Sequence, residues 1–151
     1  MIGVVELLEL FATLAAGIFS GASIYINLVE HPARIQCGTA LALAQFAPSY
    51  QRATLMQATL AATGFLAACG AYVLGAGTPW LIGGTLLGLV IPFTLLVILP
   101  TNRRLLSPAL ATDSPEAAQL LDRWGKLHAV RSILSFISFL VFLFALSQKS
   151  R

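Results

Sequence analysis

Four long runs of apolar residues, separated by shorter polar stretches, dominate the pattern of hydrophobic and polar positions along the chain. The runs cover residues 4–29, 53–74, 80–99 and 127–146. Each contains about 20 residues or more, which as an α-helix is long enough to cross the roughly 30 Å hydrocarbon core of a membrane. The pattern therefore predicts an all-α fold: an integral membrane four-helix bundle in which residues 1–151 form a single domain.

The polar stretches predict how these helices begin and end. Residues 34–51 mix apolar and polar side chains, which favours a short interfacial helix after the first span. Ser114, Pro115 and Glu116 are typical of a helix start, with an N-cap, a proline at the first position and an acid in the first turn. We therefore expect helix 4 to begin near Pro115, as a cytoplasmic extension of the last span, with Gly125 loosening it midway.

The distribution of charge predicts the orientation of the bundle. Charged residues make up only 10% of the chain, compared with about 25% in soluble domains. Lys and Arg are concentrated around the two long loops, at Arg34, Arg52, Arg103, Arg104, Arg123, Lys126 and Arg131. The opposite side holds Lys149 and Arg151. The positive-inside rule then predicts long loops in the cytoplasm and both termini outside it, which we expect in the inner membrane of a bacterium.

Several classes of protein do not fit this sequence. The first apolar run follows Glu6 and Glu9 and no basic residue, which is wrong for a signal peptide and indicates a retained span. Cys37 and Cys69 form no C-x-x-C motif, which excludes the usual thiol-disulfide enzymes. The net charge of +3 lies at one face and favours contact with anionic membrane lipid rather than nucleic acid.

Small residues at helical spacing indicate close helix packing in two of the spans. Gly17-x-x-x-Gly21 lies in the first span and Gly84-x-x-x-Gly88 in the third. This spacing lets two helix backbones approach closely. The contact can be inside the bundle itself or between two copies of the chain, so a homo-oligomer is one possible partner arrangement. Pro92 in the third span predicts a kink there.

The candidate site consists of polar seams on the first and fourth helices, which start at the same membrane face. On helix 1 the seam is formed by Asn27, Glu30, His31 and Arg34, spaced i, i+3, i+4 and i+7. On helix 4 it contains Trp124, His128 and Arg131, while Arg52 and Asn102 join it from the ends of helices 2 and 3. Ionisable groups near a membrane usually face the bundle interior or a cavity. We therefore expect an amphipathic pocket for a flat hydrophobic small molecule.

Structural explanations compete with this reading. Glu30 and Arg34 also suit a simple i,i+4 ion pair, and Trp124 suits the interfacial aromatic belt. Glu30, His31 and His128 have the ligand types of a non-haem metal site, although their spacing gives that reading no support. General acid–base catalysis by one of the two histidines, with an arginine holding an oxyanion, fits the residue types better. No cofactor is predicted, since no nucleotide-binding glycine pattern is present.

Three blocks of sequence resemble a known family. "YINLVEHPAR", "LPTNRRLL" and "WGKLHAVRS" are similar to the signature blocks of a family of small four-span membrane proteins that includes the anthrone oxygenases. The resemblance implies oxidation of an anthrone to an anthraquinone with O2, without flavin or nicotinamide. It also implies roles for the seam residues and for Asn102, with proton abstraction by a histidine, enolate stabilisation by an arginine, and Trp124 stacked on the substrate ring.

Two main functional hypotheses follow, and the sequence leaves open whether the chain is an enzyme. The first is a cofactor-independent monooxygenase that acts on a small hydrophobic aromatic, supported by the polar mouth above an apolar pocket. The alternative is a non-catalytic membrane protein that binds a lipid or quinone or supports a partner complex, because no self-sufficient redox motif is present. A small transporter fits less well, since four spans show no inverted repeat.

Overall fold

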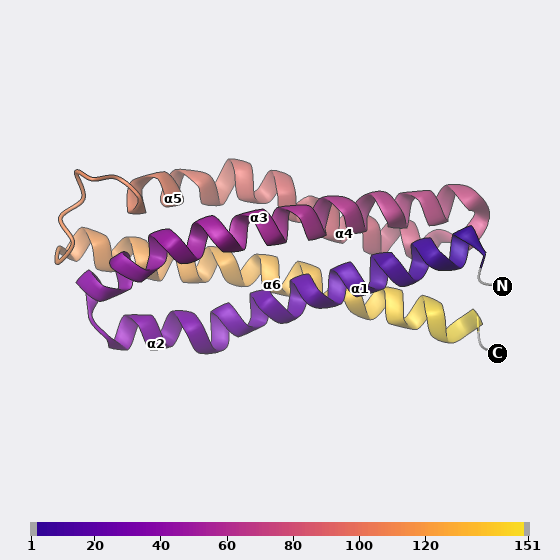
Figure 1. Ribbon diagram of the computed structural model, residues 1–151, viewed down its shortest axis with the longest axis horizontal. Helices are drawn as coiled ribbons and strands as arrows, with labels where there is room; N and C mark the ends of the chain where they lie inside the picture. Colours follow the sequence, from indigo (N-terminus) through magenta and orange to yellow (C-terminus); the bar gives the residue numbers. More distant parts are fainter. Residues whose placement is uncertain (1–2, 150–151) are drawn as a thin grey trace.

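Four long helices pack side by side and alternate in direction, so both termini lie at one end of the bundle (Figure 1). The computed structural model describes residues 3–149, and Arg151, which enters the orientation argument, lies outside them. The elements are α1 (Val4–Tyr25), η1 (Ile26–Glu30), α2 (His31–Gln36), α3 (Thr39–Ala71), η2 (Tyr72–Ala76), α4 (Thr78–Phe93), η3 (Thr94–Ile98), α5 (Leu99–Leu105) and α6 (Pro115–Lys149). η1 and η3 are π-helical turns, whereas η2 is interrupted at Gly75, whose φ is +92°. The predicted all-α four-helix bundle is confirmed.

The core lies where these helices face one another. α1 and α4 each pack against both α3 and α6, so the four helices form a square in cross-section. One half of the core combines small residues such as Ala16 and Ala68 with the large rings of Phe19, Trp80 and Phe142. The Trp80 and Phe142 rings stack with centroids 5.0 Å apart. Small residues beside large rings allow close helix packing without voids.

The four helical segments are long and apolar enough to span a membrane, and they carry a broad apolar outer surface. They contain 33, 38, 28 and 35 residues, equivalent to about 42–57 Å at about 1.5 Å per residue. Large apolar side chains are exposed along each segment, for example at Leu14, Leu66, Leu89 and Leu140. Such a surface is stable when lipid covers it. This is an integral membrane protein whose helices extend beyond a hydrocarbon core of roughly 30 Å.

The predicted short interfacial helix over residues 34–51 is wrong. The chain turns at Gly38, whose φ of +90° is readily available only to glycine, and α3 then runs without interruption from Thr39. Ala42, Leu43 and Phe46 on its first turns are buried in a second core cluster, together with Trp124 of α6. Because these apolar side chains face the bundle, the segment belongs to the second long helix and does not lie on the membrane interface.

The fourth helix begins as predicted but is not loosened at Gly125. Ser114 Oγ accepts a hydrogen bond from the Ala117 backbone N–H at 3.1 Å, and α6 continues unbroken to Lys149. A Cβ atom at Gly125 would lie 2.7 Å from the Nε2 atom of His31. Gly125 therefore leaves room for the His31 ring against α6.

The glycines of the two small-residue motifs mostly serve packing inside the monomer. A Cβ atom would lie 2.9 Å from Phe139 at Gly17, 2.9 Å from Ala68 at Gly84 and 2.8 Å from Phe65 at Gly88. At Gly21 nothing lies within 4 Å of the added atom. Association of two copies stays a prediction. In the third span, α4 continues through Pro92 and passes into the π-helical turn η3.

Candidate functional site

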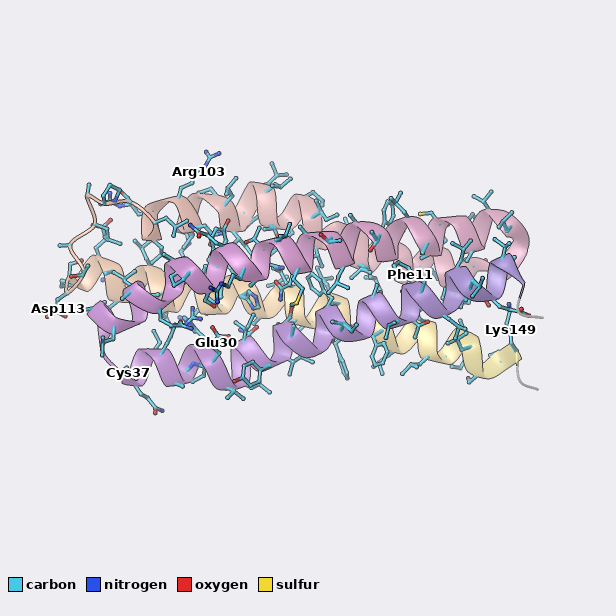
Figure 2. All side chains as sticks on the ribbon, in the orientation of Figure 1. Phe11, Glu30, Cys37, Arg103, Asp113 and Lys149 are labelled. Carbon is cyan, nitrogen blue, oxygen red and sulfur yellow. The ribbon has the colours of Figure 1, made fainter. Side chains whose placement is uncertain are left out.

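The polar seams of the first and last helical segments meet inside the bundle, towards the end away from the termini. Figure 2 shows Glu30 towards the end that also carries Cys37 and Asp113, and far from Lys149. Hydrogen bonds between residues about a hundred positions apart hold these segments together. The prediction that helices 1 and 4 bring polar groups to one end of the bundle agrees with this arrangement.

Asn27, in the π-helical turn η1, is the centre of the strongest contact between the seams. Its Oδ1 atom lies 2.7 Å from His128 Nδ1 and accepts a hydrogen bond from Ser132 Oγ at 2.6 Å. Its Nδ2 atom donates to the Gly125 carbonyl oxygen at 3.0 Å. A backbone carbonyl only accepts, so this contact fixes which end of the amide faces Gly125. Oδ1 therefore faces His128, Nδ1 of a neutral His128 carries the proton, and Nε2 keeps its lone pair.

Trp124 lies between the two histidines. Its ring stacks on His128, with centroids 4.7 Å apart and planes 29° apart, and is tilted against His31 at 5.1 Å. Phe46 meets it edge-on at 5.3 Å. Trp124 thus stacks on a histidine, and its expected stacking on a substrate ring stays a prediction.

The residues of the expected metal set are not gathered around one point. Trp124 separates His31 from His128, and Glu30 is occupied by other partners. Across residues 3–149, no group of three or more His, Cys, Asp or Glu side chains is arranged to hold a metal ion.

Arg34 is neutralised by a carboxylate. Its guanidinium pairs with Glu30, as the simple i,i+4 reading predicted. Gln45 Nε2 at 3.0 Å and Ser49 Oγ at 2.7 Å also donate to this carboxylate. The Arg34 Cζ atom lies 5.8 Å from the ring centre of Trp124, so the pair also supports the aromatic cluster.

Arg131 has no such carboxylate. Its Nη2 atom donates to Gln57 Oε1 at 2.7 Å, and its Cζ atom lies 5.4 Å from the ring centre of Phe19. Its buried Nε atom has no hydrogen-bond partner, and none of the ion pairs within the described part of the chain includes it. A part-buried guanidinium held by a neutral amide retains its capacity to bind an anion.

Two adjoining cavities surround this arginine. The polar cavity measures about 20 Å³, room for about one water molecule. It is lined by Ile26, Arg34, Phe46, Ser49, Tyr50, Ala53, Thr54, Gln57, Asn102, Trp124, His128 and Arg131. The apolar cavity measures about 130 Å³ and is lined by Phe19, Tyr50, Thr54, Gln57, Ala58, Ala61, Val90, Ile91, Thr94, Leu95, Leu99 and Arg131. Because they share four residues, including Gln57 and Arg131, the two cavities form one amphipathic pocket.

The structure sorts the predicted site residues into three groups. Those that line the polar cavity are Arg34, Asn102, Trp124, His128 and Arg131. The supporting residues contact this first group: Asn27 bonds to His128, Glu30 pairs with Arg34, and His31 packs against Trp124. Arg52 is exposed and lines an open groove between α1 and α3 instead. Asn102 is buried with its Oδ1 atom unpaired, so it adds a free acceptor to the cavity wall.

The sequence pattern did not predict that the site includes Gln57, Tyr50 and Ser132. Gln57 is 2% exposed and holds Arg131, while its Nε2 atom donates to Ser23 at 3.3 Å. It is the only amide in the second apolar run, and a polar side chain within a span is a signal that could have revealed it. Tyr50 and Ser132 lie near the starts of the second and fourth apolar runs, where polar residues are common and carry little information.

The fold and the pocket together define a four-helix membrane protein with a buried site at one end. The family model described as anthrone oxygenase matches residues 46–141. Anthrone oxygenase tpcL from Aspergillus fumigatus is 32% identical over 133 residues, which cover 81% of this chain and 82% of that protein. The chain belongs to the anthrone oxygenase family, as the sequence blocks predicted. At the family level this supports an oxygenase-like function on an aromatic substrate. No solved structure matches the chain at a significant level.

Proposed function

We propose that this protein oxidises a fused-ring hydrophobic aromatic of the anthrone class with O2, with His128 as the general base and Arg131 as the oxyanion-binding group. The proposal combines the family assignment with one observation. His128, whose tautomer is set by Asn27, and an arginine without a carboxylate partner both line the same buried cavity.

His128 fits the role of base better than His31. The bond from Nδ1 to Asn27 leaves the lone pair of the ring on Nε2, and the ring is part of the cavity wall. This is the arrangement in which an imidazole can accept a proton from a substrate. The His31 ring is packed against Trp124 and beneath Gly125 and does not line either cavity next to Arg131. We assign His31 to support of the Trp124 ring.

Arg131 fits the role of oxyanion holder better than Arg34. Negative charge that develops on the substrate oxygen is best stabilised by a donor that is already in place and is not paired with another anion. Arg34 is paired with Glu30, whereas Arg131 is held only by the neutral Gln57. Arg131 also stands where the polar cavity meets the apolar one, so a substrate can place its rings in the apolar part and its oxygen next to the guanidinium.

The reaction then balances with O2 as the only co-substrate. His128 Nε2 takes the hydroxyl proton from the enol tautomer of the substrate beside Arg131, and the electron pair is delocalised onto the opposite carbon of the central ring. The resulting anion forms a C–O bond with O2 at that carbon, which is oxidised as O2 is reduced to a peroxide. The imidazolium returns its proton to the peroxide. Loss of water, with cleavage of the O–O bond and of the remaining C–H bond, leaves the second carbonyl.

We also propose that the pocket end of the bundle faces the cytoplasm. The bundle has its termini at the end opposite the pocket (Figure 1), and the Lys and Arg count argues that the pocket end faces the cytoplasm. The inner membrane of a bacterium stays a prediction, since the relative named above is fungal.

The test is oxidation of anthrone by the purified protein in lipid nanodiscs, followed by anthraquinone absorbance and O2 uptake. The spontaneous rate in protein-free nanodiscs is subtracted. We expect His128→Gln to lower the enzymatic rate about 10²–10⁴-fold, the usual contribution of a general base. His31→Gln keeps a base in place, so we expect it to lower the rate less than about 10-fold. Loss of turnover in His31→Gln with a normal rate in His128→Gln would refute the assignment. Anthrone binding without any oxidation by the wild type would favour a binding protein instead.

A further inference from the structure

The apolar cavity opens on the side of the bundle, between α3 and the π-helical turn η3. Up to Pro92 the third helical segment packs against α3 through α4. Beyond Pro92, η3 and α5 pack against α6, while α3 keeps its main packing with α1 and α4. The third segment thus diverges from α3 at the level of the cavity. This is the place where a proline and a π-helical turn relax helix geometry.

The rim of the cavity confirms that it reaches the outer surface. Thr54 and Ala58 of α3 and Leu95 of η3 all line the cavity, and all three are exposed. Leu95 is 56% exposed. The inner end of the same cavity is formed by Gln57 and Arg131. The cavity is therefore a passage from an apolar rim to a charged inner wall.

The rim lies within the part of the bundle that faces hydrocarbon. Ala58 is about 21 Å along α3 from Tyr72, and Leu95 is about 26 Å along its segment from Thr78. Both distances fall inside a hydrocarbon core of roughly 30 Å measured from the turn between these helices. Leu55, Met56, Leu96 and Val97, the chain neighbours of the rim residues Thr54 and Leu95, are also exposed and apolar.

The passage on the polar side is too narrow for a ring. The polar cavity has a volume of about 20 Å³ and is enclosed by large side chains that include Trp124 and Arg34. The apolar cavity, at about 130 Å³, is close in size to an apolar cavity that binds benzene. It therefore holds about one ring of a fused aromatic, and the remaining rings would extend through the lateral opening.

We infer that the opening between α3 and η3 admits planar fused-ring molecules directly from the bilayer, oxygen-bearing edge first, so that the edge reaches Arg131 and Gln57. The inference rests on the proposed function for the identity of the substrate. It adds the route, which the family assignment does not provide. A hydrophobic anthrone concentrates in the membrane, so a lateral entrance takes it from the phase in which it is abundant.

The test uses two adjacent leucines with different positions relative to the cavity. Leu95 lines the opening, whereas Leu96 is 76% exposed and lines a separate outer groove. Leu95→Trp should obstruct the opening, and Leu96→Trp adds the same bulk to the lipid-facing surface. Association and dissociation of anthraquinone, the product of the proposed reaction, are measured in nanodiscs by stopped-flow fluorescence. Thermal unfolding establishes that both variants fold, and Ala58→Phe obstructs the opening from the opposite side.

An obstructed entrance slows entry and exit together. We expect Leu95→Trp and Ala58→Phe to slow both rates about 10-fold or more while Kd changes less than about threefold, and Leu96→Trp to match the wild type. Equal association and dissociation rates in all the proteins would overturn the inference. A raised Kd with an unchanged association rate would also overturn it, because that result indicates only that the new side chain fills the cavity. Slowed binding in a protein that does not oxidise anthrone would refute the proposed function and support the route. Normal anthrone oxidation, with association and dissociation rates that the obstructing variants do not change, would support the proposed function and refute the route.

Discussion

Substitution of Gly125 by alanine tests whether the close contact between Gly125 of α6 and the His31 ring holds the site together. The added Cβ atom would lie 2.7 Å from His31 Nε2 and 2.8 Å from its Cδ2 atom, well inside normal contact distance. The His31 ring cannot retreat freely, because it is packed against Trp124, which in turn stacks on His128. Overpacking of this kind costs about 1–3 kcal/mol. Replacement of a helical glycine by alanine also raises the free energy of unfolding by about 1 kcal/mol, because alanine has the higher helix propensity.

Gly21→Ala is the matched control for this change. Gly21 is also helical, but a Cβ atom there meets nothing within 4 Å. The propensity gain is common to both variants and cancels when they are compared. The difference in free energy of unfolding between Gly125→Ala and Gly21→Ala therefore isolates the overpacking, which we expect to make Gly125→Ala less stable by about 1–3 kcal/mol.

The measurement is reversible unfolding of both variants in mixed micelles, with the anthrone oxidation assay run on the same samples. The shift of the His31 ring passes through Trp124 to the proposed base, so we expect Gly125→Ala to lower kcat/KM as well. Gly21→Ala should keep the wild-type value. Equal stability and equal turnover of the two variants would show that the His31 ring does not lie against Gly125, and would refute this arrangement of the site.

Three further predictions concern single contacts. Asn27→Leu removes the acceptor that fixes the His128 tautomer, so kcat should fall about 10-fold or more while binding of anthraquinone by stopped flow stays near wild type; an unchanged kcat would contradict the positioning role. Gln57→Leu leaves the part-buried guanidinium of Arg131 without its acceptor and should lower the free energy of unfolding by about 1–3 kcal/mol; a stability equal to that of the wild type would show that the bond contributes nothing. Lys149→Met removes the cation 2.7 Å from the Glu9 carboxylate, which is 1% exposed, and should cost about 1–3 kcal/mol by denaturant titration. The double variant with Glu9→Gln should recover most of that loss, and a double variant as unstable as the single one would contradict the pairing.

The sequence by itself determined the class of the fold and the end of the molecule that carries the site. Four apolar runs of sufficient length require four helices in a membrane, since backbone polar groups in lipid must bond within the helix. The Ser114 cap marks the start of the last helix for an equally local reason. Such signals depend on residues within one or two turns of each other. The mixed composition of residues 34–51 is also local, but it cannot separate a helix lying on an interface from one packed against a neighbour.

Only the tertiary structure decided which polar residues form the pocket. Asn27 and His128 are 101 positions apart, and Gln57 and Arg131 are 74 apart. Helical periodicity shows which residues share a face, but not the axial register or the rotation that brings two faces together. That register is set by packing between elements, as where Gly125 admits the His31 ring. The same packing determines which arginine meets a carboxylate and which is left to bind a substrate oxygen.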